Sequence, residues 1–404
     1  MTLDLLALSR QVEEAALPLQ DAERARESSL SRALSVFSHW QGTVDALRAK
    51  VDGCGAHMTF RVPRLRQEWG EVIGPPGLPE DYGVIAVDGS QIDRDRHAGL
   101  DCALINIGTA ALWYGERSHA DLSSQPLLLC KENDLYLADP ENKDNREPIE
   151  GALLHAKRSV LECGRLAELS QVLSEEGPLL CLVDNSLVLW GLMGRRFETY
   201  VRRALLEEYG VHLRRFRELA QAGKRVALVG YVSKSDSSQV VNLLRLADCQ
   251  DPDCRNCEER YPRRQQSCHE LGRLRDRDLF AAVLSTPGSR SALFDDPVST
   301  GENAISPVEV SFFYLNTGEE IARAEVPGWV ADDPALLQFA HATLWSQARL
   351  GFGYPVALTE AHEQAVVSVA DREQFWSLIE STSYTHRLPY APSIKSQGKR
   401  LRAL

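Results

Sequence analysis

The chain has 404 residues, and its 45 lysines and arginines against 57 aspartates and glutamates give a formal net charge of −12. Hydrophobic residues make up 44% and charged residues 25%, a composition typical of a folded protein. These values exclude a mainly disordered chain, a collagen-like repeat and a small disulfide scaffold. The length suits two or three domains, or one large domain with insertions. The acidic balance argues against a protein that holds nucleic acid by its overall charge.

The sequence predicts a cytoplasmic location. Its first residues contain no basic region followed by an apolar run, so they do not resemble a signal peptide. No stretch approaches the roughly 18–20 apolar residues that cross a membrane. In such a chain the nine cysteines, an odd number, are expected to be mostly free thiols.

The first part of the chain changes character at a breaker cluster over residues 74–79, Gly-Pro-Pro-Gly-Leu-Pro. Before it, apolar residues recur at helical spacing over residues 1–70. We therefore predict an N-terminal helical region over residues 1–75 that contacts a second copy or a partner. After it, an apolar strand ends at Asp88, and residues 100–115 predict one or two further strands.

The middle of the chain alternates strands with helices. The polar residues 116–150 predict mostly loop, and residues 150–175 predict a helix. A buried strand over residues 179–192, with a polar interruption, is followed by an Arg-rich helix over 195–222 and a strand over 226–233. Such alternation predicts an α/β sheet that helices cover on both faces.

The last part predicts a hairpin and further helices. The turn residues Asn316-Thr317-Gly318 lie between two apolar runs, which indicates a β-hairpin. Helices are expected at 278–284, 334–350 and 360–380. The basic tail from residue 389 is expected to be loop.

Two carboxylates, Asp88 and Asp184, stand in apolar strand segments, each in the pattern Val-Asp-Gly/Asn-Ser. A carboxylate inside an apolar run is costly unless it is paired or binds a metal. On adjacent strands the two could converge on Mg²⁺ or Mn²⁺, and two such ions would clamp the attacking and leaving oxygens of a phosphodiester. The alternative is that each aspartate caps a turn or helix.

A third acid would complete such a site. The helix expected over residues 150–175 offers Glu162, close to its apolar face, and Glu168 further along. For both residues the alternative is a solvated helical glutamate, which is the common case.

At this point the sequence resembles a known family. The segments VIAVDGSQI, LLCLVDNSLVLWGL, VGYVSKSDSS and GYPVALTEAHEQAVVS, in that order, look like the NurA nucleases, and the resemblance runs from about residue 80 to 397. It implies an RNase H-like (Piwi-like) α/β fold: a mixed central sheet flanked by helices, spanning residues 80–404, with an N-terminal helical region and a Cys-rich insertion at about 248–270.

The resemblance also implies an activity and partners. The family's enzymes are Mn²⁺-dependent DNA exonucleases and single-strand endonucleases that process DNA ends. They form homodimers and work with a hexameric DNA-translocating ATPase, HerA. The cofactor expected from the resemblance is therefore Mn²⁺ or Mg²⁺.

Matching the family's motifs residue by residue assigns six positions. Asp88 and Asp184 match the two strand acids, although Asn185 stands where the family often has Gly. Glu162 matches the helix glutamate, with Glu168 as the fallback. These acids would bind metal and polarise a water. The remaining matches are Lys234, a basic residue after the next strand, and two residues from the C-terminal part of the chain. Tyr354 could contact phosphate or a base, and His362 could bind metal or donate a proton. Taken alone, these three could equally be solvated or structural residues.

A cysteine cluster stands apart from the resemblance. Cys249, Cys254, Cys257 and Cys268 have the spacing C-x₄-C-x₂-C-x₁₀-C, which could hold a structural Zn²⁺. The second knuckle is incomplete, so the alternative is a loop with free or redox-sensitive thiols.

Basic residues are clustered despite the negative total. Residues 195–225 contain nine Arg or Lys and four Glu, and residues 395–404 contain four basic residues and no acid. One interpretation is a solvated helix face. The other is a channel that follows DNA phosphates, with the candidates Arg195, Arg196, Arg202, Arg203, Lys395, Lys399 and Arg400.

The resemblance therefore implies a metal-dependent deoxyribonuclease that acts in DNA end resection during double-strand break repair, with single- and double-stranded ends as substrates. The alternative is a catalytically weak or inactive adaptor that binds DNA ends and loads or stimulates the ATPase ring. A phosphohydrolase acting on another phosphodiester, such as RNA, is a third possibility.

Overall fold

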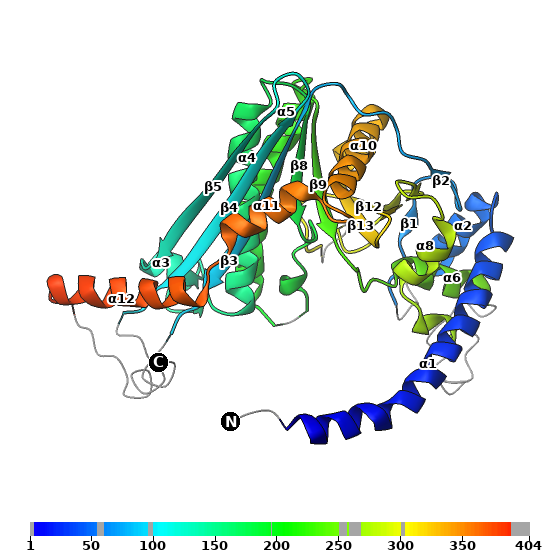
Figure 1. Cartoon of the computed structure of the whole chain (residues 1–404), viewed down its shortest axis with the longest axis horizontal. Coiled ribbons are helices and arrows are strands. Elements are labelled where there is room, and N and C mark those ends of the chain that lie inside the picture. Colours follow the sequence, from blue (N-terminus) through cyan, green and yellow to red (C-terminus); the bar gives the residue numbers. More distant parts are fainter. Residues whose placement is uncertain are drawn as a thin grey trace. The chain divides into compact units, whose positions relative to one another are not determined.

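The computed structural model describes residues 4–54, 60–95, 100–194, 196–249, 257, 268–299 and 304–388 (Figure 1). The chain divides into two compact units, each assembled from several segments. The first unit contains residues 1–74, 233–297 and 312–323. The second contains residues 75–232, 298–311 and 324–404.

The first unit packs the N-terminal helices against short elements from the middle of the chain. Its core contains Phe37, Leu47, Trp69, Leu243 and Phe280. The elements are α1 (Leu5–His39), α2 (Val44–Cys54), β1 (Arg64–Leu65), β2 (Val72–Ile73), α6 (Gln239–Asp248), η4 (Leu271–Arg273), α8 (Asp276–Val283), β10 (Arg290–Ser291), β11 (Phe294–Asp295) and most of β12 (Val310–Asn316).

The second unit is built on a mixed sheet whose strands run in the order β13-β9-β8-β3-β4-β5. β3 pairs with β4 and β4 with β5 in antiparallel fashion, whereas β3 pairs with β8 and β8 with β9 in parallel. The mixed α/β sheet expected from the sequence is therefore confirmed. The strands are β3 (Tyr82–Ile92), β4 (Ala103–Tyr114), β5 (His119–Leu129), β8 (Leu179–Asp184), β9 (Val226–Val232) and β13 (Ile321–Pro327), the last from Ala324 on.

Helices cover both faces of this sheet. α4 (Ala152–Leu173) and α11 (Val356–Ala365) both pack on β3, and α5 (Thr199–Gln221) packs on α4 (Figure 1). Gly108 of β4 allows α11 to approach, because an added Cβ would lie 2.2 Å from the carbonyl oxygen of Ala361. The other elements are α3 (Glu132–Leu135), β6 (Tyr136–Ala138), β7 (Arg146–Pro148), η2 (Trp190–Leu192), α9 (Gly328–Ala331), α10 (Pro334–Leu350) and α12 (Val369–Thr385).

The main core lies between the sheet and helices α4 and α5. Ile85, Val87, Val183, Leu205 and Phe216 are buried there. The apolar runs that predicted β3, β8 and β9 are the central strands, and they are apolar because helices cover them on both sides. Cys102, Cys163 and Cys181 are buried free thiols, as expected for the cysteines of this chain, and the last two belong to this core.

The sequence missed one long strand. Residues 119–129 form β5, where the polar composition predicted loop. β5 pairs with β4, and every residue of it except Leu129 is at least partly exposed. A polar strand of this kind has no apolar alternation to indicate it, because its stability comes from backbone pairing with a buried neighbour.

Three boundaries also differ from those expected. β3 continues past Asp88 to Ile92, because its antiparallel pairing with β4 extends that far. β8 ends at Asp184, and the apolar residues after it form a loop and η2. The single helix expected over 360–380 is two helices, because Ser368 caps a new one through the backbone N–H of Asp371.

In the described part of the chain, no helix combines the length and the apolar character that crossing a membrane requires.

Candidate active site

Asp88 and Asp184 hold matching positions on two neighbouring parallel strands. Val87 of β3 pairs with Val183 of β8, and each aspartate is the next residue of its strand. Because residues in register on parallel strands point to the same face, both carboxylates belong to one face of the sheet. The two acids therefore stand on adjacent strands of the sheet.

Asp88 is bound to His362 from the C-terminal part of the chain. Oδ2 of Asp88 lies 2.7 Å from Nδ1 of His362, whose side chain is 59% exposed. The other carboxylate oxygen accepts the backbone N–H of Gly89 at 2.8 Å. The end of α11 is fixed over β3 and β4, since the carbonyl of Ala365 accepts hydrogen bonds from Ser90 Oγ at 2.5 Å and from Asn106 Nδ2 at 2.9 Å.

Asp184 is paired with Tyr354. Burial raises the pKa of Asp184, the hydrogen bond from Tyr354 lowers it, and the nearby charge of Asp88 raises it. Tyr354 is fixed in turn, because its ring contacts Tyr231 of β9 edge-to-face with 5.2 Å between centroids. Tyr354 is therefore held by packing and also reaches an acid of the site.

Glu162 completes the acidic group, and Glu168 does not. The pKa of Glu162 is raised to about 7, mainly by burial, which Arg158 opposes and to which the charges of Asp88 and Asp184 add. Glu168 lies on the same helix with a side chain that is 59% exposed, 3.6 Å from Arg165. The structure therefore places Glu162 with the two aspartates.

The carboxylate of Glu162 occupies the space that a side chain at Gly89 of β3 would fill. An added Cβ on Gly89 would be 2.4 Å from Oε1 of Glu162. Arg158 Nε lies 3.0 Å from the same oxygen, but the two atoms are not aligned for a hydrogen bond. A buried carboxylate oxygen without a well-directed donor is costly. Sequence reasoning missed Gly89 and Arg158, although Arg158 stands one helical turn before Glu162.

The three acids are close enough for the charges of two to raise the pKa of the third, but their carboxylates do not converge on one position. Within the described ranges, no three His, Cys, Asp or Glu side chains are grouped as the ligands of one metal ion would be. Each candidate instead contacts a neutralising or hydrogen-bonding side chain, which limits the repulsion among three carboxylates.

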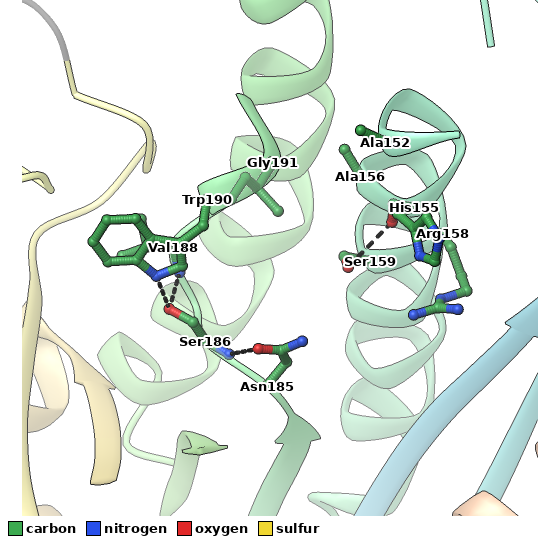
Figure 2. Close-up of a pocket in the computed structure, with 11 residues that line it drawn as sticks. Ala152, His155, Ala156, Arg158, Ser159, Asn185, Ser186, Val188, Trp190 and Gly191 are labelled. Carbon is green, nitrogen blue, oxygen red and sulfur yellow. Dashed lines mark hydrogen bonds between the residues drawn. The ribbon is translucent and has the colours of Figure 1, made fainter. Parts of the chain in front are cut away.

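A cavity of about 250 Å³ adjoins these residues, between the start of α4 and the segment after Asp184. Its polar lining includes His155, Arg158 and Asn185. Figure 2 shows Asn185 pointing toward α4 across this space, whereas the indole of Trp190 points away from α4. Trp190 Nε1 donates to Ser186 Oγ at 3.0 Å.

The other predicted site residues are distributed as follows. Lys234 is exposed in the first unit, and its carbonyl accepts a hydrogen bond from Arg277. On and just before α5, Arg196 is exposed beside the ring of Phe197, Arg202 is half-buried, and Arg203 lies 3.7 Å from Glu207. The last contact matches the solvated helix face considered from the sequence.

The remaining candidates cannot be placed. Arg195, Lys395, Lys399 and Arg400 lie outside the described residues. The same holds for Cys254 of the cysteine cluster. Cys249 and Cys257 are partly exposed and Cys268 is buried beside Arg245, whose guanidinium lies 3.8 Å from its sulfur.

Comparison with known proteins gives one family. The family model described as the NurA domain matches residues 82–367. A solved structure described as the crystal structure of NurA with manganese is 14% identical over 76% of this chain and 91% of that chain, with a TM-score of 0.32. A comparison with curated proteins finds no match.

Proposed function

The chain belongs to the NurA family, a family of nucleases, and on this premise we propose that it is a Mn²⁺-dependent deoxyribonuclease. The proposed activities are exonuclease action at DNA ends and endonuclease action on single strands. The reaction would be hydrolysis of a phosphodiester bond.

The observation that carries this proposal is the group formed by Asp88, Glu162 and Asp184. Two of these acids occupy matched positions on parallel strands, and the third is buried on the helix that packs beside them. The pKa of Glu162 is raised to about 7, partly by the other two charges. Carboxylates forced together in this way are typical of functional sites, because they disfavour folding unless a cation or proton neutralises them.

The side chains of the site are of the types that hold a hard divalent cation, although within the described residues their spacing is not that of ligands to one ion. Asp88, Glu162 and Asp184 supply carboxylate oxygens, and His362 supplies an imidazole nitrogen. Oε1 of Glu162 is buried without a well-directed donor, which is the type of atom that a cation would satisfy. When bound, the metal would polarise water and the phosphodiester. We propose Mn²⁺ as this metal, with Mg²⁺ as the alternative, because the family resemblance implies it.

The chain's own groups would perform the other tasks. Tyr354, held through Asp184, would contact a phosphate or a base. His362 would orient Asp88 and could transfer a proton to the leaving oxygen. Lys234 is proposed to neutralise phosphate charge. Arg196, Arg202 and Arg203 are proposed contacts to the DNA backbone.

Three proposals concern assembly and location. We propose a homodimer, a HerA-type hexameric ATPase as partner, and a role in DNA end resection in the cytoplasm. Support comes from membership of the family. A structural Zn²⁺ at the cysteine cluster remains a separate proposal, which metal analysis of the purified protein would test.

The test uses end-labelled single- and double-stranded DNA with Mn²⁺, Mg²⁺ or EDTA. Wild type should cleave with Mn²⁺ and not with EDTA. Asp88→Ala and Asp184→Ala should lose cleavage and remain folded. Asp93→Ala is the matched control, because Asp93 is an exposed acid near the end of the same strand segment, bound by Gln91 Nε2 at 3.0 Å.

Two outcomes would contradict the proposal. Cleavage by Asp88→Ala at the wild-type rate would exclude the assigned site. No cleavage by wild type with either metal, together with stimulation of a HerA-type ATPase, would favour the adaptor. The adaptor predicts DNA-end binding that Asp88→Ala does not change.

A further inference from the structure

Phe352 is an aromatic residue in an unusual position. Its side chain is 93% exposed, and its backbone φ is +54° in the turn between α10 and α11. A bulky residue rarely adopts positive φ, and full exposure of a phenyl ring adds no folding stability. The turn is fixed by its backbone, because Gly351 N donates to Gln347 O at 3.0 Å and Gly353 N to Ala348 O at 2.8 Å. The ring therefore points outward without any packing that would explain it.

The turn also restricts which position can present a ring. An added Cβ on Gly351 would lie 2.0 Å from the carbonyl oxygen of Tyr354. Gly353 has φ +106°, which a side chain rarely tolerates. Of Gly351, Phe352 and Gly353, position 352 is thus the one that carries a side chain, and it does so at φ +54°.

This turn is fixed to the candidate active site. Tyr354 follows two residues later and hydrogen-bonds Asp184. Tyr231 of β9 donates its hydroxyl to the carbonyl of Gly353 at 3.4 Å. Because two consecutive Cα–Cα steps span at most about 7 Å, Phe352 starts within that distance of Tyr354. The exposed ring is therefore presented by the same segment that carries Tyr354 to Asp184.

We propose that Phe352 stacks on a nucleobase of single-stranded DNA and positions the strand for cleavage at the acids, a role that rests on the proposed function. An exposed, rigidly presented ring is what stacking on a base requires, and stacking tolerates any sequence because every base has a π-face. Arg349, exposed three residues earlier, places a positive charge near the same strand. Phe352 is a positioning residue: it touches the base and not the reacting phosphate.

The experiment measures DNA binding by fluorescence anisotropy, with the full-length protein in EDTA so that the DNA stays intact. The probes are a labelled single-stranded oligonucleotide and the same length of reduced abasic strand. Stacking contributes about 1–3 kcal/mol per base, so Phe352→Ala should raise the Kd for the base-containing strand about 5- to 150-fold. The Kd for the abasic strand should not change. Phe352→Tyr should bind like wild type.

Two controls separate stacking from general effects. Leu350→Ala removes an apolar side chain that is 46% exposed beside the same turn, and it should not change the preference for bases. Phe352→Gly suits the positive φ and should unfold at the wild-type temperature or above while losing the base-dependent affinity.

An equal loss of affinity for both strands, or no loss, would overturn the inference. This result is distinguishable from failure of the proposed nuclease activity. If Phe352→Ala weakens binding of the base-containing strand but not of the abasic strand, and wild type does not cleave with Mn²⁺, the stacking inference is supported and the proposed hydrolysis is rejected. If wild type cleaves with Mn²⁺ but Phe352→Ala changes the Kd for the two strands equally, the proposed hydrolysis is supported and the stacking inference is rejected. A wild type that binds neither strand in EDTA rejects stacking, and the cleavage assay with Mn²⁺ alone decides hydrolysis.

Discussion

Nδ1 of His362 lies 2.7 Å from Oδ2 of Asp88, although 274 positions of sequence separate the two residues. The contact exists because α11 lies directly on the sheet at Gly108, where the strand offers no side chain to hold it off. The C-terminal histidine is thereby brought to the N-terminal acid. The geometry supports two roles for His362, orientation of Asp88 and proton or metal chemistry.

The first prediction separates these roles. His362→Ala should lower Mn²⁺-dependent cleavage at least about 10-fold, because Asp88 loses its partner. His362→Asn can keep a hydrogen bond to Asp88 but cannot titrate. Recovery of activity in the Asn variant would assign orientation, and continued loss would assign proton or metal chemistry. His386→Ala, an exposed histidine just beyond α12, is the control. Wild-type rates in His362→Ala would remove the residue from the site.

The second prediction concerns Gly89, whose missing side chain leaves the space that the carboxylate of Glu162 occupies. Gly89→Ala would place a Cβ 2.4 Å from Oε1 of Glu162, so the carboxylate or the helix must shift. We expect a loss of about 1–3 kcal/mol in the free energy of unfolding, measured in urea, and reduced cleavage. The loss of unfolding free energy caused by Gly89→Ala should be smaller in a Glu162→Ala background, because the carboxylate that the new Cβ meets is absent. Gly77→Ala is the control, because nothing lies within 4 Å of its added Cβ. Full stability of Gly89→Ala would contradict the packing.

Much of this site could be predicted from the sequence, for a physical reason. Aspartates at the ends of apolar runs are conspicuous, and parallel pairing brings the ends of neighbouring strands together. Glu162 and Glu168 could not be separated, because both stand on one helix and only packing decides which is buried. Gly89 was missed since Asp-Gly ordinarily indicates a turn, whereas here the glycine lies within a strand.

The less visible features depend on tertiary contacts. β5 has no apolar pattern, because it is a polar strand that pairs with a buried neighbour. Phe352 could not be distinguished from a packed loop aromatic, since nothing in Gly-Phe-Gly-Tyr reveals which ring is buried. The backbone bonds of the turn decide that Tyr354 points inward and Phe352 outward.

The third prediction concerns Asn185, which follows Asp184 with φ +133°. This region is populated almost only by glycine, and other residues in it carry a strain of about 1–3 kcal/mol. Asn185→Gly should therefore raise the free energy of unfolding by up to about 1 kcal/mol, after subtracting the greater freedom of glycine in the unfolded chain and the hydrogen bond from Ser186 N that the variant loses. Asn185→Ala should lower it, because the strain stays and the hydrogen bond from Ser186 N at 2.9 Å is lost.

Asn142→Gly is the matched control for Asn185→Gly. Asn142 also accepts a backbone hydrogen bond, from Asp144 N at 3.3 Å, but its φ is not positive. Replacing Asn by Gly should lower the free energy of unfolding at position 142 and raise it at position 185, as measured by urea or thermal unfolding. Destabilisation at both positions would show that Asn185 is not strained.

The fourth prediction uses the raised pKa of Glu162 in metal-free protein. An unfolded glutamate ionises near pH 4.5, whereas burial raises the pKa of folded Glu162 to about 7. Between these values the folded state holds a proton that the unfolded state has lost, so raising the pH favours unfolding. The difference of about 2.5 units corresponds to roughly 3 kcal/mol, which is lost as the pH rises from 4.5 through 7.

Glu162→Gln should remove this loss. Urea unfolding in EDTA at pH 5 and pH 8 would measure it, and wild type should lose about 3 kcal/mol more than Glu162→Gln between the two. Glu168→Gln, an exposed change on the same helix, should behave like wild type. Added Mn²⁺ should stabilise wild type at pH 8 and stabilise Glu162→Gln less, because a cation neutralises the carboxylates that repel one another. Identical pH dependence of wild type and Glu162→Gln would show that the pKa of Glu162 is not raised in the folded protein, and the proposed site would lose its main support.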